Sequence, residues 1–230
     1  MISIDIATLF PDMCETVLNC SILGRARKAG LVSIKTYDIR DFTLDKHRRV
    51  DDAPYGGGRG MLMQADPIFR CYEYVCSIRS TKKMHVIYLS PQGKTLTQSR
   101  ALELSKLNTS LFLICGHYEG IDQRVIDEIV DEEISIGDYV LTGGELSALV
   151  LVDSVVRMLP GVLASSECFE DESHFDGLLE YPQYTRPEVW HGRRVPEVLL
   201  SGHHANIKEW REKKSIEVTR FKRPDMLRKK

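Results

Sequence analysis

The residues best suited by type and spacing to do chemistry form a loop at 136–145, with the sequence Ile-Gly-Asp-Tyr-Val-Leu-Thr-Gly-Gly-Glu. Its glycine pair, Gly143 and Gly144, opens a predicted helix, and the preceding residues combine apolar side chains with free backbone groups. Such a loop can hold an adenine ring, which needs an apolar surface and a few polar partners. The alternative is an ordinary turn between a strand and a helix, which periodicity does not exclude.

A second loop, Tyr55-Gly56-Gly57-Gly58-Arg59-Gly60, contains too much glycine to be a helix or a strand. Its free amides can cradle an anion or let a nucleic-acid base approach closely. It matches neither the Walker loop nor the GxGxxG pattern. The basic group Lys46-His47-Arg48-Arg49 just upstream favours a loop that faces RNA, and the alternative is a flexible surface turn.

The remaining polar residues do not indicate catalysis by their spacing alone. Asp153 and Arg157 stand four positions apart on a predicted helix, where a surface ion pair is the simplest interpretation. The histidines show no ligand spacing, and the 6 cysteines form no CxxC pair. We therefore predict neither a metal site nor a disulfide framework.

Short apolar runs that end in turns predict the strands of a sheet. Residues 84–90 end at a turn over 90–93, residues 110–115 end at Gly116, and residues 1–6 alternate apolar and polar side chains. Helices are predicted from the N-cap Asp66, from the N-cap Thr97 to about 107, and over 144–159. Strands alternating with helices indicate an α/β fold with a mostly parallel sheet covered on both faces. Its ligand site is expected at the carboxyl ends of the strands.

The charge balance divides the chain in two. Residues 1–180 hold 18 basic and 27 acidic residues, whereas residues 181–230 hold 13 basic and 6 acidic residues. A basic module attached to an acidic body suggests binding to a polyanion, although a basic helix can also be a solvated surface. The stretch around 164–176 is polar, acidic and aperiodic, which is typical of a connector between domains.

The N-terminus has no basic segment leading into a long apolar stretch, and no apolar run approaches the length of a membrane span. We therefore expect a cytoplasmic protein without membrane association.

Motifs over nearly the whole length resemble the bacterial tRNA (guanine-N1)-methyltransferases, the TrmD family of the SPOUT class. The segments that carry the resemblance are LFPDM, GRARKAGL, VDDAPYGGGRGMLM, VIYLSPQG, CGHYEGIDQRV, SIGDYVLTGGEL, DSVVRMLPGVL, GLLEYPQYTRPEV, PEVLLSGHH and IKEWR.

The resemblance implies a SPOUT fold with a deep trefoil knot, a rare exception to normal chain topology. It also implies a homodimer, and it sets the domain boundaries at 1–163 for the cofactor-binding domain, 164–176 for a flexible linker and 177–230 for a small helical domain that binds tRNA. The cofactor is S-adenosyl-L-methionine. Residues in three loops are expected to bind it: Tyr88, Leu89, Ser90, Pro91, Gly93, Gly116, Tyr118, Glu119, Ile136, Gly137, Asp138, Tyr139, Val140, Leu141, Gly143 and Gly144.

The same resemblance implies methylation of N1 of the guanine at nucleotide 37 in the anticodon stem-loop, preceded by another guanine. Neutral guanine keeps a proton on N1, so a base must remove it while positive charge stabilises O6. Arg157 is expected to act on O6. Counting back from Gly177 without a gap places the base at Glu172, and Asp171 takes the role if the linker shifts by one residue.

Two other functions fit part of the sequence. A SPOUT methyltransferase acting on ribosomal RNA would lack the segments GLLEYPQYTRP and YGGGRGMLM, which this chain contains. An RNA-binding protein with a vestigial pocket is disfavoured by the intact glycine set and by both charged catalytic candidates.

Overall fold

A five-stranded sheet forms the centre of the N-terminal part of the chain. In a computed structural model that describes residues 2–81, 83–164 and 172–229, the chain divides into two compact units, 1–164 and 165–230. The sheet of the first unit has the order β2-β1-β6-β5-β7, and every neighbouring pair is parallel. Its strands are β1 (Ile2–Thr8), β2 (Val32–Asp38), β5 (His85–Thr95), β6 (Leu111–Cys115) and β7 (Glu132–Ser135).

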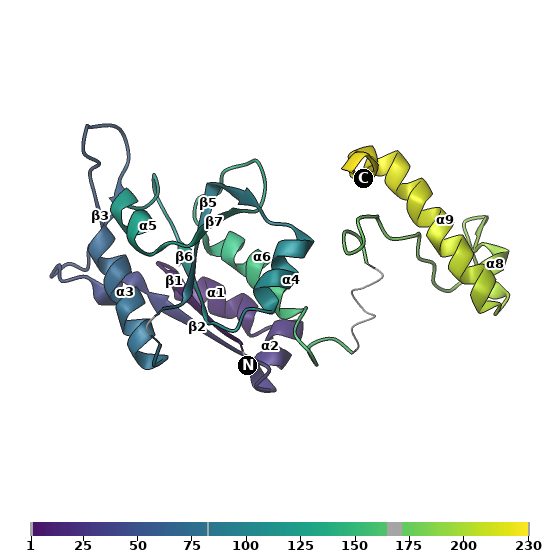
Figure 1. Cartoon of the computed structure of the whole chain (residues 1–230), viewed down its shortest axis with the longest axis horizontal. Coiled ribbons are helices and arrows are strands. Elements are labelled where there is room, and N and C mark those ends of the chain that lie inside the picture. Colours follow the sequence, from purple (N-terminus) through teal and green to yellow (C-terminus); the bar gives the residue numbers. More distant parts are fainter. Residues whose placement is uncertain (1, 82, 165–171, 230) are drawn as a thin grey trace. The chain divides into compact units, whose positions relative to one another are not determined.

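Helices cover both faces of this sheet (Figure 1). One core cluster joins the sheet to α1 (Pro11–Leu18), α2 (Ser21–Lys28), α4 (Gln98–Ser105) and α6 (Glu145–Val156). The other joins it to η1 (Ile39–Phe42), α3 (Ala65–Ile78) and α5 (Gln123–Ile129). The predicted α/β class, with a parallel sheet covered on both faces, is therefore confirmed.

The predicted core face of α6 and the N-cap Thr97 are confirmed, whereas the predicted N-cap Asp66 is wrong because it lies inside the first turn of α3. Thr97 caps α4, since its Oγ1 accepts a hydrogen bond from Arg100 N at 3.2 Å. The five residues predicted to face the core are all buried: Ala148, Val152, Val155 and Val156 in α6, and Leu159 just after its end. Four predicted ends differ, since α4 ends at Ser105, α3 begins at Ala65, ahead of the predicted cap Asp66, and α6 begins one residue after Gly144 and ends at Val156, ahead of 159.

The predicted turn at 90–93 is wrong, because β5 continues through it to Thr95. The pairing of β5 with β7 shifts register between Leu89 and Lys94, so the extra residues form an irregularity inside one strand. A Cβ atom on Gly93 would lie 2.4 Å from the backbone carbon of Glu133. Glycine therefore lets β5 return close to the backbone of β7 after the irregularity.

A small hairpin interrupts the first unit between η1 and α3. Strands β3 (Asp51–Asp52) and β4 (Leu62–Met63) pair antiparallel, and the glycine-rich loop connects them. Beyond β4 the ladder continues onto the segment after β6, since Glu119 N donates to Met61 O and Met63 N donates to Gly120 O, both at 3.0 Å. The hairpin therefore belongs to the carboxyl end of the sheet.

The second unit is built on the long helix α9 (His204–Lys222), with the hairpin β8 (Val189–Trp190) and β9 (Arg193–Arg194), the short helix α8 (Glu197–Leu200) and η2 (Pro224–Lys229). Leu179 N donates to the buried Thr219 Oγ1 at 2.8 Å, which fixes the segment before the hairpin to α9. Of the predicted linker 164–176, residues 165–171 lie outside the described residues. None of the described helices is long and apolar enough to cross a membrane.

Candidate functional site

A cavity of about 380 Å³ opens at the carboxyl ends of β5, β6 and β7. Its size lies within the range of roughly 300–1,000 Å³ that is common for small-molecule sites. Of the 16 residues predicted to bind the cofactor, 13 line it: Tyr88, Leu89, Ser90, Pro91, Gly116, Tyr118, Glu119, Ile136, Tyr139, Val140, Leu141, Gly143 and Gly144. Gly93, Gly137 and Asp138 belong to the same loops but are not among the lining residues.

Glycine is required where the cavity walls approach each other most closely. A Cβ atom on Gly116 would lie 2.9 Å from the ring of Tyr88, and one on Gly144 would lie 2.7 Å from Cys115 Cα. The backbone of Gly144 donates to Gly116 O at 2.9 Å. The loop after β6 and the start of α6 are thus in direct backbone contact, which side chains at these positions would prevent.

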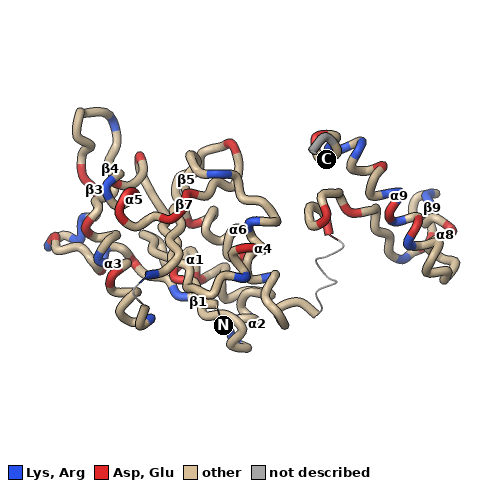
Figure 2. Tube along the Cα trace, in the orientation of Figure 1, with Lys and Arg blue, Asp and Glu red and all other residues tan. Residues whose placement is uncertain are grey.

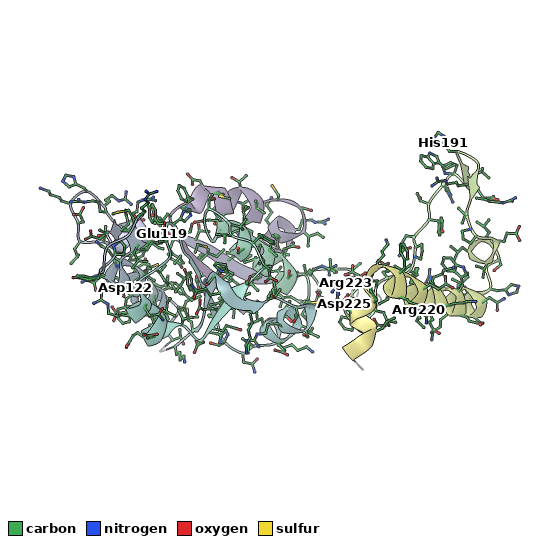
Figure 3. The ribbon with its side chains drawn as sticks, turned by 90° about the horizontal axis from the view of Figure 1, so that it is seen from above. Glu119, Asp122, His191, Arg220, Arg223 and Asp225 are labelled. Carbon is green, nitrogen blue, oxygen red and sulfur yellow. The ribbon has the colours of Figure 1, made fainter. Side chains whose placement is uncertain are left out.

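The lining combines apolar surface with negative charge. Leu89, Ile136 and Leu141 supply apolar side chains, and Glu119 and Glu133 supply carboxylates. Such a lining suits a ligand that has a flat apolar ring and a positive charge. Glu119 comes from the segment that follows β6, as does Asp122 (Figure 3).

Tyr88 contributes a neutral phenol to the cavity wall. Burial, and then the charge of Glu133, raise the pKa of Tyr88 to about 12. The hydroxyl therefore keeps its proton at neutral pH and remains a hydrogen-bond donor.

The buried carboxylate of Glu145 connects three elements next to the cavity: the end of β1, the segment after β6 and the start of α6. Glu145 opens α6 and is 2% exposed, yet its two oxygens are both engaged. Thr8 Oγ1, at the end of β1, donates to Oε1 at 2.5 Å, and His117 Nε2 lies 2.8 Å from Oε2. The helix N-terminus favours the negative charge of this first-turn carboxylate. With Glu145 ionised, His117 Nε2 must carry the proton, because a carboxylate only accepts hydrogen bonds.

His117 fits tightly between its neighbours. A Cβ atom on Gly143 would lie 2.1 Å from Nε2, and the ring centroid of Phe10 lies 5.0 Å from that of the imidazole. His117 N donates to Met63 Sδ at 3.2 Å, which links the cavity to the β3–β4 hairpin. The imidazole thus fixes the distance between the loop after β6 and the glycine pair that precedes α6.

Two buried thiols lie beside Glu145. Burial, followed by the charge of Glu145, raises the pKa of Cys14 to about 12 and that of Cys115 well above its usual value. Both thiols are therefore neutral at physiological pH and add no charge near the carboxylate.

The glycine-rich loop ends at the mouth of the cavity. A Cβ atom on Gly60 would lie 2.4 Å from Glu119 Oε1, so this end of the loop lies against a residue that lines the cavity. Tyr55 in the same loop is fully exposed. In the upstream basic group, Arg48 pairs with Asp41, and its Nη2 lies 3.7 Å from Asp38 Oδ2. The contact of Gly60 with Glu119 therefore brings the glycine-rich loop and the segment after β6, which are far apart in the sequence, to the same edge of the sheet.

The predicted catalytic residues come from both units. Arg157 is the half-buried C-cap of α6, and its backbone N donates to Asp153 O at 3.1 Å. Glu172 is half-buried and its carbonyl accepts from Phe175 N at 3.3 Å. Asp171 lies outside the described residues. Among the described residues, no group of three or more histidine, cysteine, aspartate or glutamate side chains is arranged to hold a metal ion.

Comparison with known sequences gives a match along almost the entire chain. A sequence model of the family described as tRNA (guanine-1)-methyltransferase TrmD matches residues 2–229. The chain belongs to this family. The resemblance, and with it an S-adenosylmethionine-dependent methyltransferase of tRNA, is confirmed at the level of the family.

Individual members of the TrmD family are similar over nearly their full length. A tRNA (guanine-N(1)-)-methyltransferase of Ruminiclostridium cellulolyticum is 59% identical over 225 residues, which cover 98% of this chain and 96% of that protein. Proteins of the same name from Lachnospira eligens and Alkaliphilus metalliredigens are 56% and 54% identical and cover 96% and 97% of this chain. The alignments cover 93% and 90% of those two relatives.

The contacts of Glu145, His117 and Thr8 were not predicted from the sequence. The one local signal was a glutamate directly after the glycine pair, at the start of a predicted helix. Its partners are remote in the chain, with Thr8 137 positions away and His117 28 positions away. Such a cluster leaves no spacing pattern in the sequence, because its members share no helix or strand.

Removing the Glu145 carboxylate should destabilise the first unit. We expect Glu145→Ala to lower the free energy of unfolding by about 3–5 kcal/mol, because His117 and Thr8 lose a buried charged partner. The measurement is urea unfolding of the full chain. Asp66→Ala is the matched control, because Asp66 is also a first-turn acid but is exposed, and it should cost about 0.3–1 kcal/mol. Equal costs for the two variants would contradict a structural role of the buried carboxylate.

Proposed function

We propose that this protein transfers a methyl group from S-adenosyl-L-methionine to N1 of the guanine at nucleotide 37 of tRNA. Membership of the TrmD family is the observation that carries the proposal. The cavity at the strand ends supports it, because its lining suits a ligand with an apolar ring and a positive charge. tRNA as the substrate is also our reason for proposing a cytoplasmic location.

In this proposal the three loops hold the cofactor. When bound, S-adenosyl-L-methionine supplies an electrophilic methyl group on a sulfonium. Leu89, Ile136 and Leu141 offer the apolar surface for its adenine ring, and Glu119 offers negative charge near the sulfonium or the amino group. The contacts of His117 with Glu145 and Gly143 fix the loop that completes this surface.

The protein must also remove one proton and stabilise one developing negative charge. As the N1–methyl bond forms and the sulfur–methyl bond breaks, a carboxylate takes the N1 proton. Glu172 is our first candidate for this base and Asp171 the second. Arg157 stabilises charge on guanine O6, which a fixed cation does without reorganisation during the reaction.

We also propose a homodimer in which the base acts on a cofactor bound by the partner subunit. The first unit carries an exposed apolar face on two helices that contact each other, α1 and α6. Its residues are 43–49% exposed: Phe10, Met13, Val17, Leu146 and Val150. Helical spacing puts Met13 and Val17 on one side of α1, with Phe10 at its N-cap, and puts Leu146 and Val150 on one side of α6. An exposed apolar face of this kind is typical of an interface between subunits.

The family also implies a trefoil knot, which we propose for the first unit. The supporting observation is the tight passage of the chain at Gly144, whose backbone lies against Cys115 and Gly116 before α6 begins. For the second unit we propose binding of the tRNA anticodon stem-loop. Its basic residues along α9 and at β9 support this proposal (Figure 2).

A methylation assay tests the proposed function. A tRNA transcript with guanine at position 37, preceded by guanine, should gain one methyl group at N1 when S-adenosyl-L-methionine is present. Transcripts with adenine at 37, or without the preceding guanine, should remain unmodified. The product is identified by mass spectrometry of digested nucleosides. Methylation of the adenine transcript, or of none, would rule out the proposal.

The identity of the base is tested by two amide variants. We expect Glu172→Gln to lower kcat by roughly 10²–10⁴-fold, the usual contribution of general base catalysis, and Asp171→Asn to change it little. Both are assayed at saturating cofactor and tRNA. The reverse pattern would place the base at Asp171. An unchanged kcat in both variants would show that neither carboxylate acts as the base.

Mixing inactive variants tests the dimer and the origin of the base. If Arg157 and the base at one site come from different subunits, a heterodimer of Arg157→Ala and Glu172→Gln has one intact site. Random pairing should then restore about a quarter of the wild-type rate, since about half of the dimers are mixed and each has one working site of two. Each variant alone provides the control rate. A monomer, or a base from the same subunit, would give no recovery after mixing.

A further inference from the structure

The hairpin in the second unit presents an exposed tip at the turn between β8 and β9. Trp190 and Arg193 are paired across the two strands, with a turn of only His191 and Gly192 between them. Both turn residues have positive φ, 49° and 75°, as the tight two-residue hairpin turn requires. Figure 3 shows His191 at the projecting end of the hairpin, away from α9. The tip is therefore a fixed shape that faces solvent within its unit.

The side chains at this tip are an indole and a guanidinium on one face. Residues directly opposite each other in an antiparallel pair point to the same side, which places Trp190 beside Arg193. Trp190 is 61% exposed, and the imidazole of His191 packs edge-on against it at 4.4 Å. Arg194 is bound to Glu188 at 2.7 Å, whereas Arg193 has no ion-pair partner among the residues that the structure describes.

Packing inside the unit does not explain this exposed tryptophan. Of the residues of this unit whose burial is described, Thr219 alone is fully buried. The other tryptophan of the chain, Trp210, lies half-buried on α9 with its ring 6.4 Å from that of Tyr184. One tryptophan therefore serves the fold of the unit and the other is held out into solvent.

We propose that the hairpin tip binds an unpaired base of tRNA, with the Trp190 indole stacked on the base and Arg193 on an adjacent phosphate. This inference rests on tRNA being the substrate and adds a specific contact to it. Stacking on an aromatic ring is the usual way in which proteins hold unpaired RNA bases, and a guanidinium beside the ring suits the neighbouring phosphate. The net positive charge of residues 181–230 favours RNA over an apolar protein surface at this tip.

Fluorescence reports directly on this contact because the chain has only 2 tryptophans. In the full chain with Trp210→Phe, all tryptophan emission comes from Trp190. We expect solvent-exposed emission from the free protein and strong quenching when a tRNA transcript is added. A fully paired RNA duplex of similar length should quench much less, since its bases are already stacked. The matched control is Trp190→Phe, in which Trp210 reports and tRNA should change the emission little.

Affinity measurements separate stacking from apolar packing. Trp190→Leu should raise the Kd for tRNA by roughly 5- to 100-fold, the effect expected from loss of one aromatic–base stack, and Trp190→Phe should restore much of the affinity. Arg193→Ser should reduce the salt slope of log Kd by about 1, because one phosphate contact is lost. Trp190→Leu and Arg193→Ser should each raise KM for tRNA in the methylation assay while kcat at saturating tRNA stays unchanged.

Two results would overturn the inference, and a third would overturn only the proposed function. Blue-shifted Trp190 emission that tRNA does not alter would show that the tip is covered by protein. Equal affinities for Trp190→Leu and wild type, in a protein that methylates tRNA, would refute the stacking contact and leave the proposed function intact. If tRNA quenches Trp190 in the Trp210→Phe protein but the wild type methylates nothing, the contact stands and the proposed function fails.

Discussion

The rest of the site depends on the hydrogen bonds that the buried Glu145 carboxylate makes with Thr8 and His117. The carboxylate connects the end of β1, the loop after β6 and the first turn of α6 through Thr8 and His117. A buried charge is tolerated only when it is paired and hydrogen-bonded, and here both oxygens are satisfied while the helix N-terminus adds a favourable potential. These contacts determine the shape of the neighbouring cavity, because His117 packs directly against Gly143, which lines it.

Around that carboxylate the chain brings separate loops together at the carboxyl edge of a parallel sheet. Glycine is the enabling residue, because the backbones of Gly116 and Gly144 touch where any side chain would collide. The β3–β4 hairpin joins the same edge by hydrogen bonds to the segment 119–122. The loops that we propose for the cofactor and the glycine-rich loop therefore share one scaffold, which would hold two ligands close together for a methyl transfer.

The two units are stabilised by different kinds of contact. The first unit buries two apolar clusters on either side of its sheet. The second has a long helix whose neighbours are tied on by polar and aromatic contacts, such as the hydrogen bond to Thr219 and the stacking of Arg211 over Tyr181 at 4.7 Å. With so little buried apolar surface, the second unit keeps aromatic and basic groups available to a ligand.

The sequence by itself determined three of the five strands of the sheet (β1, β5 and β6), the buried face of α6 and most of the loops that line the cavity, because periodicity, caps and glycine pairs are local signals. It did not predict β2 and β7. It misplaced the end of β5, since the return of the strand to β7 after its irregularity depends on a close approach at Gly93 that is not visible locally. Only the tertiary structure placed Thr8 and His117 on Glu145, and Gly60 against Glu119. Those contacts join residues from different elements, and their geometry exists only once the sheet has ordered its strands.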